Sequence, residues 1–340
     1  MININKLGIN KSVIEELGLI IGNDNGVLEI QVPSFSAFDD LLSLIGDTEN
    51  YFKTFNRFYR GVSDKTYGLE PSLVFKGLEE VESDMINQFY LSSPESFTHC
   101  SSNYEKLALM QHYGLPTRLL DFTKNPLVAA WFACKDNTKG KDAAVYVALS
   151  NMRASYRFIG LVCSFAFQDE DIFDIKGVNA FISNDDLRYY ISYLFMNSSF
   201  DNFVDAPAFD QREKNQQSVF LLGVNKPILI KTNDLAEITR IEYSSTHSGE
   251  FFSFIDNETP SFERKIIPGH IECYNKEKDS HFLIKIIIPS SIKDCFCKEL
   301  KIRGITKEYI YPSLSNCAER ISDDFINNKD YYSNLKNLIK

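Results

Sequence analysis

The segment with the clearest helix boundary signals lies near position 100 and ends in a glycine and a proline. Ser102 and Glu105 have the spacing of an N-terminal capping box, so a helix is predicted to begin near Asn103. This helix is predicted to end at Gly114-Leu115-Pro116, because glycine favours the residue after a helix and proline cannot continue one. A chain with such a boundary must turn sharply here.

A second helix follows closely. Asn125 and Pro126 are typical of an N-cap and a first helical position, so a helix is predicted over Leu127–Cys134. This helix is apolar on nearly all sides, which indicates burial. The residues between the two helices, Thr117–Thr123, are predicted to form a connector, and a buried strand is predicted at Ala143–Leu149.

The remaining hydrophobic patterns indicate helices mixed with strands, without regular alternation. Further strands are predicted at Leu28–Val32, Arg57–Val62, Ser218–Val224, Ile228–Ile230 and Phe282–Pro289. Further helices are predicted at Phe35–Gly46, Phe75–Phe89, Asp185–Met196, Ser291–Lys301 and Ser313–Phe325. This mixture predicts an α+β fold in which helices pack on a mixed, largely antiparallel sheet.

Composition defines the class of protein. The 340 residues carry 36 Lys and Arg against 46 Asp and Glu, a net charge of −10, which disfavours a general nucleic-acid or anionic-membrane surface. The start of the chain resembles no signal peptide, and no apolar stretch approaches a membrane span of ~20 residues. The seven scattered cysteines suggest a reduced, cytoplasmic protein. Cys295 and Cys297 have no second half-site, so no metal is expected.

Polar and charged side chains are concentrated between the two apolar helices, where a connector needs only turn residues. Arg118 and Asp121 can pair with each other, hydrogen-bond the helix ends, or face a cleft. Asp121 and Thr123 also lie where a residue can cap the second helix. Capping explains neither His112 nor Arg118, so these two residues indicate a functional site.

Several of these motifs resemble the FRG domain family of bacterial and phage proteins, named for its Phe-Arg-Gly signature. The matching segments are Phe58-Tyr59-Arg60-Gly61, Leu69–Leu73, Gln111–Thr123, Asn125-Pro126-Leu127, Gln216–Phe220 and Tyr311–Leu314. Ser218 and Ser313 replace the family's usual glycine and aspartate. The resemblance extends from about Phe58 to about Ile321. It implies an N-terminal extension over residues 1–50, an FRG-like domain over 51–325 with an acidic insertion near 168–210, and a tail over 326–340.

The order of motifs also resembles the ADP-ribosyltransferase fold, in which an arginine, a serine or threonine and a late glutamate surround NAD. This fold-level analogy places Arg60 at the arginine position, Thr117 or Thr123 at the hydroxyl position, and Gln216 or Gln217 at the glutamate position. Since glutamine carries no charge, Glu213 or Asp121 is a candidate to supply the carboxylate.

The resemblance implies an enzyme that consumes NAD as its substrate and requires no separate cofactor, in a toxin or phage-defence role. It would transfer ADP-ribose to a protein or nucleic acid, or hydrolyse NAD. The alternatives are a non-catalytic sensor of a nucleotide or phage protein, and a metal-independent RNase that uses His112, Arg118 and Asp121.

The predicted site has four catalytic candidates and a set of binding candidates. The catalytic candidates are Arg60, His112, Arg118 and Asp121. The substrate-binding candidates are Tyr59, Gly61, Gln111, Tyr113, Thr117, Thr123, Gln216 and Gln217. Arg60, His112, Arg118, Asp121 and Gln217 are expected to converge on one cleft of ligand size.

Overall fold

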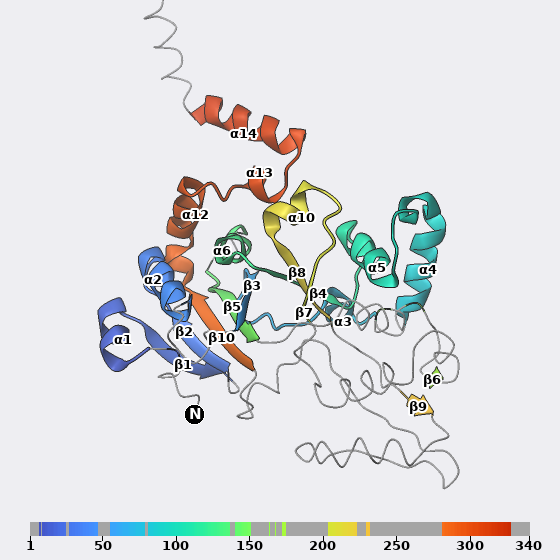
Figure 1. Cartoon of the computed structure of the whole chain (residues 1–340). Coiled ribbons are helices and arrows are strands. Elements are labelled where there is room, and N and C mark those ends of the chain that lie inside the picture. Colours follow the sequence, from blue (N-terminus) through green and yellow to red (C-terminus); the bar gives the residue numbers. More distant parts are fainter. Residues whose placement is uncertain are drawn as a thin grey trace, which may run out of the picture.

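The computed structural model shows a central sheet with helices packed against it (Figure 1). It describes residues 7, 9–24, 27–46, 55–78, 81–136, 140–150, 163, 167, 172–174, 203–222, 229–231 and 281–327. The predicted helix Asp185–Met196, most of the predicted insertion and most of the predicted tail lie outside these residues. No helix among them is long and apolar enough to cross a membrane.

Eight strands form the main sheet, in the order β1-β2-β10-β5-β3-β4-β8-β7. Their bounds are β1 Ile20–Asp24, β2 Val27–Gln31, β3 Asn56–Val62, β4 Leu119–Thr123, β5 Ala143–Ser150, β7 Phe203–Asp205, β8 Ser218–Leu222 and β10 His281–Ile288. Neighbouring strands are antiparallel, except that β2 and β10 are parallel. The two remaining strands, β6 Ile172–Asp174 and β9 Leu229–Lys231, form a separate parallel pair. The predicted α+β class with a mixed, mostly antiparallel sheet is therefore confirmed.

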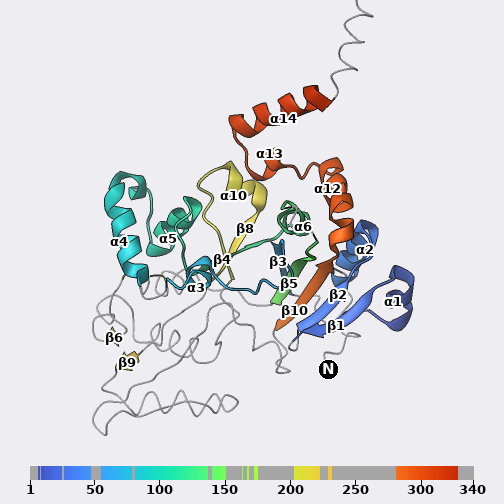
Figure 2. The same ribbon diagram turned by 180° about the vertical axis from the view of Figure 1, so that it is seen from behind.

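Most helices lie on one face of the sheet or at its ends, as the two opposite views show (Figures 1 and 2). They are α1 Lys11–Leu17, α2 Phe35–Gly46, α3 Ser72–Phe75, α4 Glu82–Ser92, α5 Asn103–His112, α6 Pro126–Cys134, α10 Gln211–Gln216, α12 Lys293–Ile302, α13 Lys307–Ile310 and α14 Leu314–Asn327, with 3-10 turns at Pro94–Phe97 and Ser290–Ile292.

The core is built on both faces of β5, whose eight residues are all buried. Val145, Val147 and Leu149 belong to the core cluster that includes α2, α6 and α12. The alternate residues Ala144 and Tyr146 belong to a second cluster on the other face. This two-sided burial explains why the strand is apolar without alternation.

Two of the secondary-structure predictions made from the sequence are wrong. The helix predicted over Phe75–Phe89 is interrupted, because Gly77 adopts a left-handed conformation (φ 64°) between α3 and α4. Phe75 is 69% exposed, so the apolar spacing did not mark one buried face. The predicted connector Thr117–Thr123 contains strand β4, which forms because Leu119–Thr123 pairs along its whole length with β8.

The sheet opens between β3 and β4. These strands are paired at one position, Tyr59 opposite Thr123, whereas β4 and β8 are paired at five. Beyond that position β3 packs closely under α6. A Cβ atom added at Gly61 would lie 1.8 Å from the Ala129 carbonyl oxygen and 2.8 Å from the Ala133 nitrogen. Gly61 is therefore required for helix packing, and the opening beside it gives access to the middle of the sheet.

Candidate functional site

A cavity of about 390 Å³ lies at this opening, a volume within the range of small-molecule sites. Its walls come from β3, the end of α5, β4, α6, α10 and the segment after α13. Of the predicted site residues, those that line it are Tyr59, Arg60, Gly61, Gln111, His112, Asp121, Thr123 and Gln216. Tyr113, Thr117, Arg118 and Gln217 are not among the lining residues.

Arg60 crosses the opening between the two strands. Its Nη1 donates to the main-chain oxygen of Asp121 (2.7 Å), while its buried Nε has no hydrogen-bond partner among the described residues. Burial lowers the pKa of Arg60, an effect that the Asp121 carboxylate opposes. The nearby Arg57, in contrast, uses Nε, Nη1 and Nη2 on main-chain oxygens at and after the end of α2. Of these two arginines, Arg60 is the one with a donor available to a ligand.

Asp121 lies beside Arg60, and a short chain of hydrogen bonds fixes its carboxylate. The Gln111 Nε2 atom donates to Asp121 Oδ1 (2.6 Å), and the Thr117 hydroxyl donates to Gln111 Oε1. The Thr117 hydroxyl also accepts from the Leu119 nitrogen (3.2 Å). Thr117 is fully buried and does not line the cavity. Its hydroxyl orients Gln111 instead of contacting a ligand.

Cations and aromatic rings cluster in another part of the cavity lining. The Arg212 guanidinium carbon lies 4.9 Å from the centre of the Tyr311 ring. Lys135 Nζ lies 5.9 Å from the same centre and 5.1 Å from that of Phe132. Arg60, Arg212 and Lys135 line the cavity together with the carboxylates of Asp121, Asp136 and Glu213, so its positive charge is local rather than general. The part with Arg212, Lys135 and the aromatic rings suits an anionic ligand that carries a ring.

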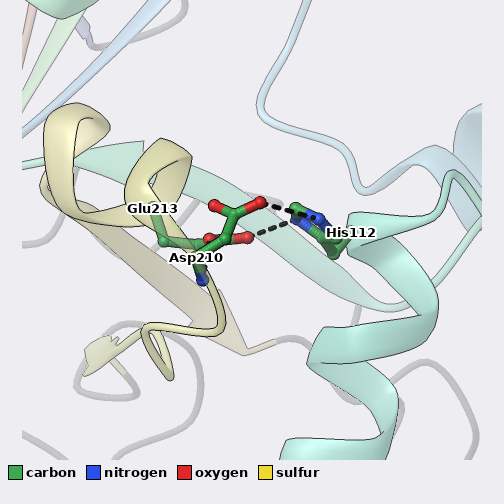
Figure 3. A group of neighbouring side chains, drawn as sticks. All are labelled: His112, Asp210 and Glu213. Carbon is green, nitrogen blue, oxygen red and sulfur yellow. Dashed lines mark hydrogen bonds and ion pairs between the residues drawn. The ribbon is translucent and has the colours of Figure 1, made fainter. Parts of the chain in front are cut away.

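His112 lies at the end of α5, next to the start of α10 (Figure 3). Its Nε2 is 3.4 Å from Asp210 Oδ2, and its Nδ1 contacts Glu213 Oε1. Burial, followed by the hydrogen bond with Asp210, raises the pKa of Glu213. The same hydrogen bond lowers the pKa of Asp210.

Arg118 occupies a different place from the one the sequence predicted. Its side chain is 1% exposed and points at α4, where Nε donates to Glu82 Oε1 (2.9 Å) and Nη2 donates to Glu82 Oε2. This two-point pairing with a buried carboxylate explains the arginine as a structural clamp. The expected convergence of five residues is therefore observed for Arg60, His112 and Asp121, and not for Arg118 and Gln217.

The remaining candidates have structural contacts. Gln217 ends α10 in the left-handed conformation (φ 48°), and Gln216 Nε2 donates to the Ile310 main-chain oxygen (3.0 Å). The Thr123 hydroxyl donates to the Gln216 main-chain oxygen (2.5 Å) and so ties β4 to α10. Tyr113 is 67% exposed and packs edge-on against His112. None of these contacts needs a ligand.

Sequence reasoning missed Tyr67, Phe132, Lys135, Asp210, Arg212 and Tyr311 as site residues. One signal was available. Asp210 and Glu213 have the D-x-x-E spacing of a capping box, and both of its reciprocal hydrogen bonds form. Tyr311 belongs to a matching segment, but the sequence did not show that α13 would carry it onto the cavity.

The FRG domain family model matches residues 56–142, which run from the first residue of β3 to the residue before β5. No curated protein and no solved structure matches the chain. The FRG resemblance predicted from the sequence is thus confirmed over these residues. The resemblance to ADP-ribosyltransferases remains a prediction.

Proposed function

We propose that this chain, whose residues 56–142 form an FRG domain, is an enzyme that binds NAD in the cavity and cleaves the nicotinamide–ribose bond of NAD. The observation that carries the proposal is Arg60, which lines the same cavity as Asp121 and whose buried Nε has no hydrogen-bond partner among the described residues. A buried donor without a partner is costly, and a phosphate oxygen would satisfy it.

The cationic and aromatic part of the lining supports a nucleotide as the ligand. Lys135 and Arg212 would bind the second phosphate of a pyrophosphate, and the aromatic rings of Tyr59, Phe132 and Tyr311 would contact the flat groups. A ligand with both features satisfies the cationic and the aromatic parts of the cavity. NAD and ADP-ribose belong to this class.

Asp121 would supply the negative charge that the reaction requires. As the bond between ribose C1′ and the nicotinamide nitrogen breaks, its electron pair leaves with nicotinamide and positive charge develops on the ribose. Water or an acceptor group then adds to C1′ and releases a proton to solvent. A carboxylate fixed by Gln111 is already oriented when this charge develops, and bound NAD would shield the exposed Asp121 side chain from water, which strengthens the electrostatic stabilisation.

Asp121→Asn is expected to lower the rate of nicotinamide release from NAD at least about 100-fold, because it removes this charge and keeps the shape of the side chain. The measurement is nicotinamide release by purified protein, with and without cell lysate as a source of acceptors. Asp136→Asn is the matched control, since it removes a carboxylate from the same cavity away from the Arg60–Asp121 pair, and it should retain the rate. Equal rates for Asp121→Asn and wild type would contradict the assigned role.

A non-catalytic nucleotide sensor is the second candidate. Gln216 and Gln217 supply no carboxylate, and the Gln216 side chain hydrogen-bonds the main chain of α13. Nucleotide binding with no nicotinamide release by the wild type would select this candidate. The RNase alternative loses its phosphate-binding arginine, because Arg118 pairs with Glu82. The toxin or phage-defence role rests on the family resemblance and would follow from NAD depletion in the host.

A further inference from the structure

His112, Asp210 and Glu213 come together although about a hundred residues separate the histidine from the two acids. The end of α5 lies next to the start of α10: His112 is the last residue of α5, Asp210 is the N-cap of α10, and Glu213 lies in the first turn of α10. Figure 3 shows both carboxylates directed at the imidazole ring.

The charge balance of this cluster is unusual for the molecule. Among the described residues the buried carboxylates are Asp64, Glu82 and Glu213. Asp64 is paired with Lys141 and Glu82 with Arg118, whereas the ion-pair partner of Glu213 is His112. Neither of the two adjacent carboxyl groups of the cluster forms an ion pair with a lysine or arginine in the described part of the chain.

We propose that His112, Asp210 and Glu213 bind a divalent transition-metal ion such as Mn²⁺ or Zn²⁺ at the edge of the cavity. One ligand atom from each residue lies within 4.8 Å of the other two. Metal–ligand bonds of roughly 2.1 Å hold ligand atoms up to about 4.2 Å apart, so small side-chain rotations complete the geometry. An imidazole with two carboxylates suits these ions better than Ca²⁺ or Mg²⁺, which prefer oxygen ligands alone.

The position of the cluster would let a bound ion contact a ligand in the cavity. His112 and Glu213 line the cavity, while the Asp210 side chain is 49% exposed and leaves a route for entry from solvent. Three protein ligands leave coordination positions open toward the same cavity as Arg60. A phosphate oxygen or a water molecule would fill them. This metal site is independent of the proposed NAD reaction, because the three residues would bind the ion whether or not a nucleotide is present.

The test is a titration of metal-stripped full-length protein with Mn²⁺ and Zn²⁺ by calorimetry, and with Co²⁺ by visible absorption, without nucleotide. The expected result is one ion per chain, an absorption band typical of nitrogen and oxygen ligands, and weaker binding as the pH falls, because protons compete for the imidazole and carboxylates. The absence of one-to-one binding at millimolar ion would overturn the proposal.

Two variants tie the binding to these residues. Glu213→Gln can keep the capping hydrogen bond to the Asp210 nitrogen while it removes the charge, and it should weaken binding at least tenfold. His99→Ala removes an exposed histidine outside the cluster and should leave binding unchanged. If Glu213→Gln binds the ions as tightly as wild type, the ions are bound elsewhere, for example at exposed Cys295 and Cys297, and the proposal is wrong.

Discussion

Glu82→Ala is expected to lower the free energy of unfolding by about 3–5 kcal/mol, because it leaves a buried guanidinium without a counter-charge. The side chains of Arg118 and Glu82 are 1% and 3% exposed, and Arg118 Nη1 already has no hydrogen-bond partner among the described residues. Without Glu82, Nε and Nη2 lose their acceptor as well. The guanidinium remains buried below the surface, so most of the cost of its desolvation is left uncompensated.

Urea unfolding measures this loss, and an exposed ion pair provides the control. Arg303 and Glu299 form a pair one helical turn apart, and both side chains are more than a third exposed (35% and 37%). Glu299→Ala should therefore cost less than about 1 kcal/mol. The double variant Arg118→Met/Glu82→Leu should recover much of the stability lost in Glu82→Ala, since no charge is then buried. Similar small losses for Glu82→Ala and Glu299→Ala would show that Arg118 is not clamped as described.

Gly61→Ala is expected to destabilise the protein by about 3 kcal/mol or more, at or beyond the upper end of overpacking losses. The new methyl group would overlap the main chain of α6 at Ala129 and Ala133. Main-chain atoms within a helix cannot rotate away as a side chain does, so β3 and α6 must separate.

Thermal and urea unfolding test this expectation, with Gly68→Ala as the matched control. A Cβ atom added at Gly68 has no heavy atom within 4 Å, so that substitution should change stability by no more than about 0.5 kcal/mol. A Gly61→Ala variant as stable as wild type would contradict the close packing of β3 under α6. The close approach of α6 explains the glycine at position 61 of the family signature.

Local signals predicted the elements whose ends they mark. Ser102 caps α5 through the Glu105 nitrogen, and Asn125 caps α6 through the Leu127 nitrogen, as their positions in the sequence indicated. Strand β4 was missed because it is short, carries Asp121 at its centre, and owes its structure to β8, about a hundred residues later. No periodicity within five residues can reveal such pairing.

The site was predictable where residue type alone indicates chemistry. His112 and Asp121 were identified because polar and charged side chains are concentrated between two apolar helices, and Arg60 because of the family resemblance. All three line the cavity. Arg118 satisfied the same criterion, but its partner Glu82 belongs to a helix that the sequence did not delimit correctly. The cavity itself depends on the single paired position between β3 and β4, which is a tertiary feature.

The central proposal is that Arg60, whose Nε has no partner in the described part of the chain, binds a nucleotide phosphate. The most direct measurement is the calorimetric affinity for ADP-ribose of wild type, Arg60→Gln and the surface control Arg303→Gln, each first shown to be folded. A hydrogen bond to a charged group contributes about 1.5–3 kcal/mol, so Arg60→Gln should bind at least about tenfold more weakly, while Arg303→Gln should match wild type. Equal affinity of Arg60→Gln and wild type, or no binding of ADP-ribose or NAD by the wild type, would contradict the account.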